Sequence, residues 1–155
     1  MGLVFGSGVK VIGADISPES VKNCREQLSS EVKNVEFVQV DFFADNEELG
    51  GFDFIFDHTF FCAIEPSLRL DWASRMDKLL GAKMGSYLLT IIYPLPASNE
   101  ADLSVGPPFE VTFSAYEDVL KVFGFECLKR WNNSELPASN QKRLGREELA
   151  IWRKK

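Results

Sequence analysis

The residues best suited to chemistry lie together in one short segment, Phe52–Pro66, which reads FDFIFDHTFFCAIEP. It begins as an apolar run, typical of a strand covered on both faces in a mainly parallel sheet. Asp57 and His58 follow that run, and the aromatic pair Phe60–Phe61 comes next. An acid, an imidazole and two aromatic rings at the carboxyl end of a buried strand predict a ligand site at that edge of the sheet.

His58 is the only histidine of the chain, and Cys62 lies four residues beyond it. An imidazole titrates in the range that suits a general base, but a lone histidine is more often structural. No serine or cysteine is evidently paired with it, and the apolar neighbours of Cys62 favour a small buried side chain over a nucleophile. We therefore assign no residue to acid–base or nucleophilic catalysis.

Two further acids each close an expected strand. Asp15 ends the run Val9–Ala14 and precedes a helix, where a carboxylate can accept both hydroxyls of a ribose. The alternative for Asp15 is a carboxylate that only stabilises the start of the helix through its dipole. Asp41 ends the strand Val35–Val40 and, with Phe42 beside it, can meet the amino group and the ring of an adenine. A core position is the alternative for Phe42.

The remaining patterns predict alternating strands and helices. Helices are expected from Ser17-Pro18, from Pro66 to Gly81 and, through a capping box, from Ser114 to Val122. The loop Leu95–Pro108 is long enough to be a candidate lid. The expected strands cover residues 9–14, 35–40, 52–56, 85–93, 125–131 and 148–152. This alternation predicts an α/β fold with a mostly parallel sheet, in which the last two strands pair antiparallel.

Composition limits the classes of function. A chain of 155 residues with 45% hydrophobic and 26% charged residues fits one soluble domain, residues 1–155. The net charge of −6 disfavours nucleic acid as a partner. The basic clusters, Lys142–Arg143–Arg146 and the tail 153–155, are expected to be solvated surface.

The cysteines and the hydropathy pattern exclude further classes. The three cysteines are far apart with no CxxC, so neither a metal site nor a disulfide framework is expected. No apolar run approaches the length that spans a bilayer. We therefore expect a soluble, cytoplasmic protein.

Several segments occur together in a recognisable order. They are GADIS at 13–17, VDFF at 40–43, IFDHTFFCAIEP at 55–66, the helix with Trp72, the strand ending in Tyr93–Pro94, GPPFEV at 106–111 and SAYEDVL at 114–120. In this order they resemble the plant thiol/halide methyltransferases, which methylate thiocyanate and halide ions and are related to thiopurine methyltransferase. The resemblance runs from about Val9 to the C-terminus.

The resemblance implies a fold, a cofactor and a set of binding residues. The fold is a Rossmann-like methyltransferase sheet, and the cofactor is S-adenosyl-L-methionine. Asp15 is expected at the ribose, and Asp41 and Phe42 at the adenine. His58 stands where the family usually has tyrosine, facing the cofactor and the acceptor.

The resemblance also implies an acceptor pocket for a small anion or thiol, such as thiocyanate, halide or hydrosulfide. Phe60, Phe61 and Tyr93 are expected to supply its apolar walls and the ring faces that stabilise a sulfonium. Charge is annihilated when such an anion attacks a sulfonium, so a water-poor pocket favours the reaction. These acceptors arrive already ionised, and no catalytic base is required.

Part of the family's pattern has no counterpart here: the N-terminal lid, the first strand and the glycine-rich cofactor loop. Gly6-Ser7-Gly8 is either a remnant of that loop or a flexible terminus. The absent strand lies at the centre of the family's sheet. The strands at 9–14 and 52–56 must therefore pair with each other, recruit Leu3–Phe5 or leave backbone groups unpaired. We expect a truncated domain with weak or absent cofactor binding.

Two other functions fit parts of the sequence. A catalytically silent isoform that associates with a full-length relative through exposed sheet edges fits the absent strand. A nicotinamide-dependent dehydrogenase rests on Asp15 alone, without a full GxGxxG or a tyrosine–lysine pair, and is disfavoured.

Overall fold

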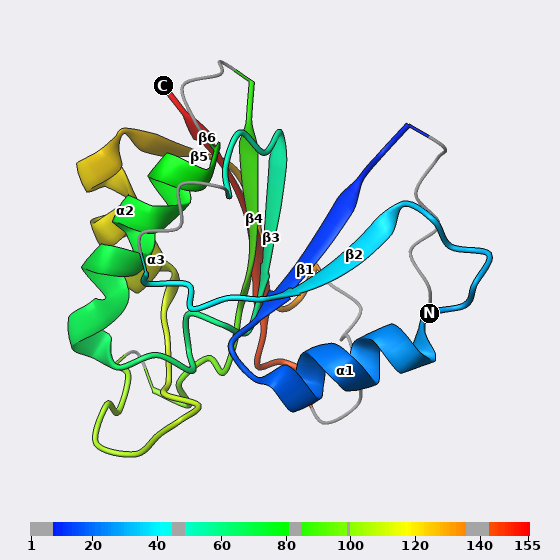
Figure 1. Cartoon of the computed structure of the whole chain (residues 1–155). Helices are drawn as coiled ribbons and strands as arrows, with labels where there is room; N and C mark the ends of the chain where they lie inside the picture. Colours follow the sequence, from blue (N-terminus) through cyan, green and yellow to red (C-terminus); the bar gives the residue numbers. More distant parts are fainter. Residues whose placement is uncertain (1–7, 45–48, 81–84, 99, 136–142) are drawn as a thin grey trace. The chain divides into compact units, whose positions relative to one another are not determined.

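The computed structural model describes residues 8–44, 49–80, 85–98, 100–135 and 143–155 (Figure 1). The chain divides into two compact units, Met1–Asn46 and Glu47–Lys155, and each is described by itself. A single domain over residues 1–155 stays a prediction.

The first unit is a parallel strand pair joined by one helix. Strand β1 (Val11–Asp15) leads through α1 (Pro18–Gln27) to β2 (Val35–Gln39). The two strands pair in parallel, with Asp15 opposite Gln39. Gly13 allows the Phe37 ring to lie against β1, because a Cβ there would come within 2.6 Å of that ring.

The predicted start of α1 is confirmed. Ser17 is its N-cap, Pro18 is its first residue, and the Ser17 hydroxyl accepts a hydrogen bond from the backbone N–H of Ser20 at 3.2 Å. Val21 is buried in this helix, and Cys24 is exposed.

The second unit holds a four-stranded mixed sheet. Its elements in chain order are β3 (Phe54–His58), η1 (Pro66–Leu68), α2 (Arg69–Leu80), β4 (Tyr87–Ile92), α3 (Phe113–Leu120), η2 (Lys121–Phe123), β5 (Phe125–Trp131) and β6 (Glu148–Lys154). The strand order is β3-β4-β6-β5. Strands β3 and β4 are parallel, and β6 runs antiparallel to both of its neighbours. The predicted antiparallel pairing of the last two strands is confirmed.

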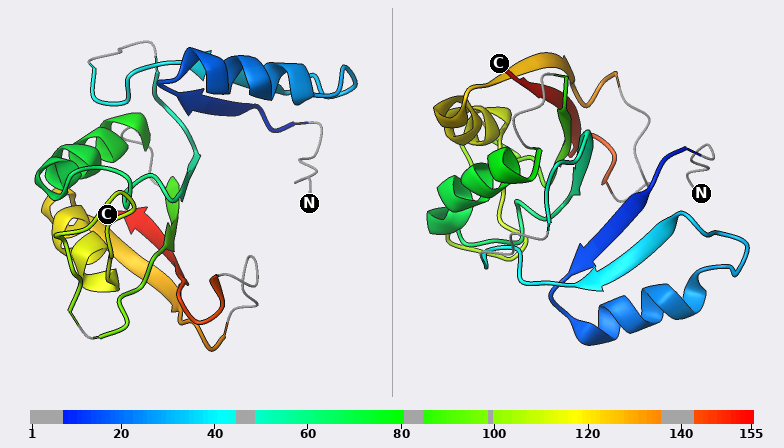
Figure 2. Two further views of the ribbon diagram at one scale, coloured as in Figure 1. Left: turned by 90° about the horizontal axis from the view of Figure 1, so that it is seen from below. Right: turned by 45° about the horizontal axis from the view of Figure 1, so that its top comes forward.

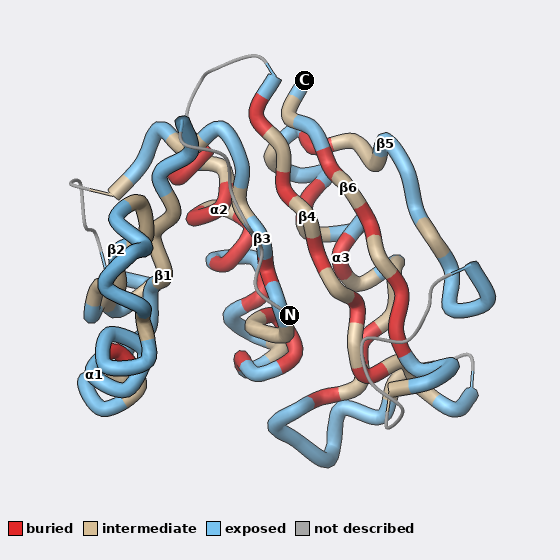
Figure 3. Tube along the Cα trace, turned by 90° about the vertical axis from the view of Figure 1, so that its right-hand side faces the viewer, coloured by how far each residue is buried: buried red, intermediate tan, exposed pale blue. Residues whose placement is uncertain are grey.

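Helices α2 and α3 cover one face of this sheet (Figures 1 and 2). The core between the layers is aromatic, and the Phe61 ring lies 3.9 Å from the Tyr116 ring and 4.7 Å from the Trp72 ring between centroids. Buried and half-buried positions alternate along β4 and β6 (Figure 3). Side chains on the helix-covered face therefore form the core, as the two-residue period of a strand requires.

Within its own unit, β3 is covered by helices on one face, and cover on both faces stays a prediction. Phe54 is 49% exposed and Phe56 is 43% exposed. They lie on the face opposite to α2 and α3 because alternate residues of a strand point to opposite sides.

The two strands expected to lose a shared neighbour belong to separate sheets. Strand β1 pairs with β2, and β3 pairs with β4. Pairing of those two strands with each other was one of three alternatives, and it is not found among the described residues. Leu3–Phe5, Gly6 and Ser7 lie outside the described residues.

The N-cap of α3 lies two residues before the one that the capping box predicted. Thr112 is the N-cap, and its hydroxyl accepts the N–H of Ala115 at 3.2 Å. Ser114 lies inside the helix and bonds the Thr112 hydroxyl instead. Helix α2 reaches Leu80, and the predicted stop at Gly81 lies outside the described residues.

Candidate functional site

The end of β3 presents an acid and an imidazole on opposite faces of the sheet. Both belong to the strand itself, which runs two residues further than predicted. Asp57 points toward the helix-covered side and is 3% exposed, whereas His58 is exposed on the other side. Only His58 is therefore placed to meet a ligand directly.

The turn after β3 is tight and internally bonded. Thr59 has a positive φ of 68°, a conformation that costs a threonine roughly 1–3 kcal/mol and that clusters at functional sites. The backbone N–H of Phe60 donates to Asp57 Oδ1 at 2.9 Å. The Cys62 thiol donates to the Thr59 carbonyl at 3.2 Å. These bonds hold the backbone on both sides of the strained residue.

Arg143 joins this site from far along the chain. Its guanidinium carbon lies 4.3 Å from the centroid of the Tyr93 ring. Its Nη1 is 3.5 Å from His58 Nε2 and 3.8 Å from a carboxylate oxygen of Glu147. Its side chain is only 18% exposed. The expectation that Arg143 is solvated surface is therefore wrong, and Lys142 lies outside the described residues.

The electrostatics favour a neutral imidazole beside a fixed positive charge. Partial burial lowers the pKa of His58, and the Arg143 guanidinium lowers it further, while Glu147 opposes the shift. At neutral pH, the site therefore presents a guanidinium and an uncharged ring. A guanidinium that rests on an aromatic face is weakly hydrated and well suited to bind an anion.

The aromatic residues predicted to line the pocket separate into two groups. Phe60 and Tyr93 are half-buried and can border an open site. Phe61 is 0% exposed and stacks on Tyr116 within the core. Its ring has no exposed surface to offer a substrate, so the structure does not support Phe61 as a wall of the pocket.

Cys62 is an inert thiol in this structure. It is 1% exposed. Burial, together with the nearby Asp57 carboxyl, raises the pKa of its thiol to about 11. A thiol that stays protonated at neutral pH is a poor nucleophile.

The first unit brings Asp15 and Asp41 to one edge of its strand pair. The N–H of Val40 donates to the Asp15 carbonyl at 2.9 Å, so the two acids follow closely at adjacent strand ends. One oxygen of Asp15 accepts the Ser17 N–H at 2.8 Å, and one of Asp41 accepts the Phe43 N–H at 2.9 Å. Both acids are exposed.

This part of the structure fits a nucleoside. Two exposed carboxylates at neighbouring strand ends suit ribose hydroxyls and an adenine amino group. Phe42 is half-buried next to Asp41, and its ring contacts the Phe43 ring edge-on at 5.2 Å. The hydrogen bond from the Ser17 N–H to Asp15 also stabilises the start of α1. Asp15 therefore also has the helix-stabilising role that was its alternative. The expected convergence with His58, in the second unit, stays a prediction.

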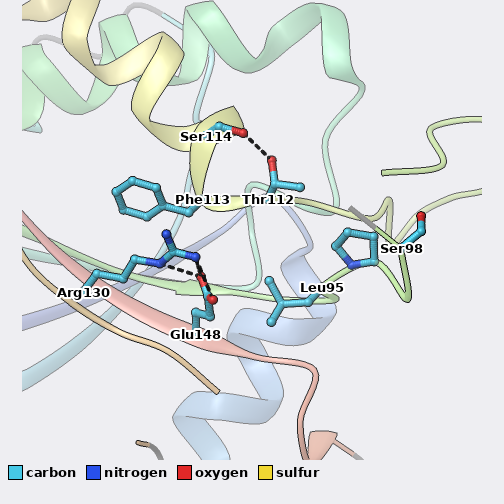
Figure 4. A pocket seen from close by; sticks show the side chains of 8 residues that line it. Leu95, Ser98, Thr112, Phe113, Ser114, Arg130 and Glu148 are labelled. Carbon is cyan, nitrogen blue, oxygen red and sulfur yellow. Dashed lines mark hydrogen bonds and ion pairs between the residues drawn. The ribbon is translucent and has the colours of Figure 1, made fainter. Parts of the chain in front are cut away.

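A cavity of about 340 Å³ lies beside the start of α3 (Figure 4). Arg130 and Glu148 form a two-pronged ion pair on its wall, with N–O distances of 2.9 and 2.8 Å. Its lining residues are Leu95, Pro96, Ser98, Thr112, Phe113, Ser114, Arg130 and Glu148. None of the predicted site residues lines it.

Two classes of site are not found in the described part of the chain. No cluster of three or more His, Cys, Asp or Glu side chains there is arranged to hold a metal ion. None of its helices has the length and apolar character needed to cross a membrane.

The fold is that of the Rossmann-like methyltransferases. A TehB-like S-adenosylmethionine-dependent methyltransferase from Corynebacterium glutamicum matches with a TM-score of 0.64 and 15% identity, over 94% of this chain and 68% of that one. The N-methyltransferase NodS from Bradyrhizobium japonicum, solved with S-adenosylhomocysteine, matches with a TM-score of 0.66 and 14% identity, over 94% of this chain and 66% of NodS. The predicted fold class is confirmed.

The family follows from the sequence. The thiopurine S-methyltransferase (TPMT) family matches residues 3–155, and the chain belongs to that family. "Probable thiol methyltransferase 2" of Arabidopsis thaliana is 42% identical over 146 residues, and "Thiocyanate methyltransferase 1" of Brassica oleracea is 40% identical over 147 residues. Both alignments cover 93% of this chain but 60% of the relative, so the chain spans less than two thirds of their length. The predicted resemblance is confirmed.

Proposed function

We propose that this chain is an S-adenosylmethionine-dependent methyltransferase that acts on a small thiol or anion, such as thiocyanate, a halide or hydrosulfide. The observation that carries the proposal is Arg143, which stacks on Tyr93 and lies beside His58. Strands β3 and β4 are adjacent and parallel, so His58 and Tyr93 are delivered at the same edge of the sheet. The names of the relatives support the same chemistry, and a cytoplasmic location stays a prediction.

The cofactor is assigned to the carboxylates of the first unit. Asp15 holds the ribose hydroxyls, and Asp41 with Phe42 holds the adenine. The family and the solved neighbours with S-adenosylhomocysteine support S-adenosyl-L-methionine in this role. When bound, the cofactor supplies an electrophilic methyl group on a sulfonium.

The acceptor is assigned to the second unit. Arg143 attracts the anion, and the neutral His58 ring and the edges of Phe60 and Tyr93 limit water around it. A partly desolvated anion is a stronger nucleophile than a hydrated one. Because the acceptor arrives ionised, no side chain needs to remove a proton, and the raised pKa of the Cys62 thiol excludes a covalent relay through it.

Product formation tests the activity. The purified chain is incubated with S-adenosylmethionine and sodium thiocyanate, and methyl thiocyanate is measured by gas chromatography of the headspace. We expect product above a control without protein. If no product forms although the cofactor is bound, the proposed activity is wrong.

Calorimetric titration tests the cofactor separately. We expect S-adenosylmethionine to bind the chain through Asp15, Asp41 and Phe42. No detectable binding would contradict the assignment of the cofactor to these residues.

A second candidate function is a catalytically silent chain that associates with a full-length relative. It is favoured by β3, an edge strand of its sheet in the described structure, on which Phe54 and Phe56 are largely exposed. Such an edge offers unpaired backbone groups to another chain. Size-exclusion chromatography distinguishes the candidates, because an inert chain is expected to oligomerise and a competent enzyme to remain monodisperse.

A further inference from the structure

The carboxylate of Asp57 lies directly beneath the turn that carries His58 and Phe60. It is 3% exposed on the helix side of β3. Its Oδ1 accepts the N–H of Phe60 at 2.9 Å, and the N–H of Phe61 also approaches the carboxyl. This hydrogen bond joins Asp57, two residues before the strained Thr59, to Phe60, the residue after it. The turn depends on this side chain for its shape.

The second oxygen of Asp57 has an incomplete set of bonds. Asp57 Oδ2 and Trp72 Nε1 are both buried without a hydrogen-bond partner at ordinary distance among the described residues. The indole N–H nevertheless lies close enough to lower the pKa of the Asp57 carboxyl. One atom is an acceptor and the other is a donor only. Each atom therefore has the bonding capacity that the other lacks.

Chemistry distinguishes a carboxylate from its neutral substitutes at this position. A carboxylate offers two acceptor oxygens: one accepts the backbone N–H of Phe60, and the other is buried near the unpaired indole N–H of Trp72. An amide has a single oxygen and a donor NH₂ group, so one of the two N–H groups loses its acceptor. An unpaired buried donor is costly, and the turn or the indole must move.

We propose that the Asp57 carboxylate is a positioning residue that ties the turn 58–61 to Trp72 of α2, and so fixes His58 and Phe60 at the acceptor edge of the sheet. The assignment of this edge to the acceptor rests on the proposed function, whereas the link between Asp57, the turn and Trp72 does not. Asp57 touches no substrate, and it acts through the turn.

The ionisable groups around this carboxyl come from three elements. Cys62 lies in the turn, Arg69 begins α2, and Tyr116 comes from α3. Asp57 raises the pKa of Cys62 and of Tyr116, and Arg69 lowers both. Arg69 is 6% exposed, and its guanidinium carbon lies 4.8 Å from the centre of the Phe61 ring. At neutral pH, Asp57 and Arg69 are the charged members of this cluster.

The single histidine makes the tie measurable without any assay of activity. The Cε1–H signal of His58 is the only imidazole signal in a proton–carbon NMR spectrum of the chain. We compare the native chain with Asp57→Asn, with Trp72→Phe, which keeps the carboxylate but removes the indole donor, and with the double variant. Glu148→Gln is the matched control, because it makes the same change at a buried carboxylate elsewhere in the unit (7% exposed).

We expect the His58 signal to shift or broaden in Asp57→Asn and in Trp72→Phe, with no further change in the double variant, and to stay in place in Glu148→Gln. In the native chain, the signal should respond to two ionisations between pH 4 and 8, its own and that of Asp57, and in Asp57→Asn to one. Unchanged His58 signals in both single variants, with circular dichroism showing that they are folded, would overturn the tie.

Titration with sodium thiocyanate separates this inference from the proposed function. We expect the native His58 signal to move on addition of thiocyanate, and the apparent affinity to fall roughly tenfold in Asp57→Asn, as misplacement of a binding group predicts. Equal affinities in native and Asp57→Asn chains would overturn the link to the acceptor. If thiocyanate leaves the native His58 signal unchanged, the proposed acceptor site is wrong. The comparison of the variants without thiocyanate still tests whether Asp57 positions the turn.

Discussion

At the scale of single residues, Asp57 and Arg143 show how burial and charge shape one edge of the sheet. Asp57 is a buried acid, and desolvation raises its pKa from 3.8 to about 6, although the backbone N–H groups of Phe60 and Phe61 and the nearby Trp72 indole lower it. Arg143 is a partly buried base on an aromatic face. The acid lies under the turn and the base beside it, so we assign the first to positioning and the second to ligand binding.

The pH dependence of stability follows from the raised pKa of Asp57. The folded state holds the proton more tightly than the unfolded state, so the stabilising contribution of this group is complete below about pH 4. This contribution is lost as the pH rises toward about 6, and the free energy of unfolding falls by roughly 3 kcal/mol in total. In Asp57→Asn, this loss should disappear. Urea unfolding at several pH values from 4 to 8 measures it, and parallel curves for the two proteins would contradict the prediction.

Arg143→Gln should change both the pKa of the His58 imidazole and the affinity for the anion. Removal of the guanidinium removes a cause that lowers the pKa of His58, so the pKa of the imidazole should rise. If the chain is active, the KM for thiocyanate should increase about tenfold with a smaller change in kcat, because binding is lost before the chemical step. Arg146→Gln is the control, since Arg146 is exposed three residues away. Equal His58 titrations in the two variants would count against a role for Arg143.

At the scale of elements, the start of α3 carries a distinct prediction. Thr112 caps the helix, so Thr112→Ala should lower the free energy of unfolding by about 1 kcal/mol. Ser114→Ala should have a much smaller effect, because Ser114 lies inside the helix and bonds only the Thr112 hydroxyl. Urea denaturation of both variants measures the difference. A larger loss in Ser114→Ala would restore the capping box predicted from the sequence.

At the scale of the whole molecule, we expect the sheet edge at β3 to promote self-association in solution. Phe54 and Phe56 expose much of their rings on an edge strand of the described sheet. Phe56→Lys places a charge on that strand, which should reduce self-association because charged residues disfavour pairing of edges. Light scattering over a range of protein concentrations measures the molar mass. Identical masses for the native chain and Phe56→Lys would remove this edge from the interaction.

The sequence by itself determined most of the elements and their order. Local signals, such as the Ser17-Pro18 start of α1 and the apolar runs of β3 and β4, act over a few residues and are therefore legible in the chain. The family resemblance also followed from local strings around Asp15, Asp41 and His58. The start of α3 was harder to predict, because each of two hydroxyl residues, Thr112 and Ser114, is of a type that suits the N-cap.

The tertiary structure alone decided which side chains meet and which face they occupy. Arg143 reaches His58 across 85 positions of sequence, and no local pattern encodes such a contact. Phe60 and Phe61 are neighbours of the same type, yet Phe60 is half-buried, whereas Phe61 is fully buried and its ring stacks on Tyr116 in the core. Burial depends on the surroundings that helices α2 and α3 create, and that is a property of packing rather than of residue type.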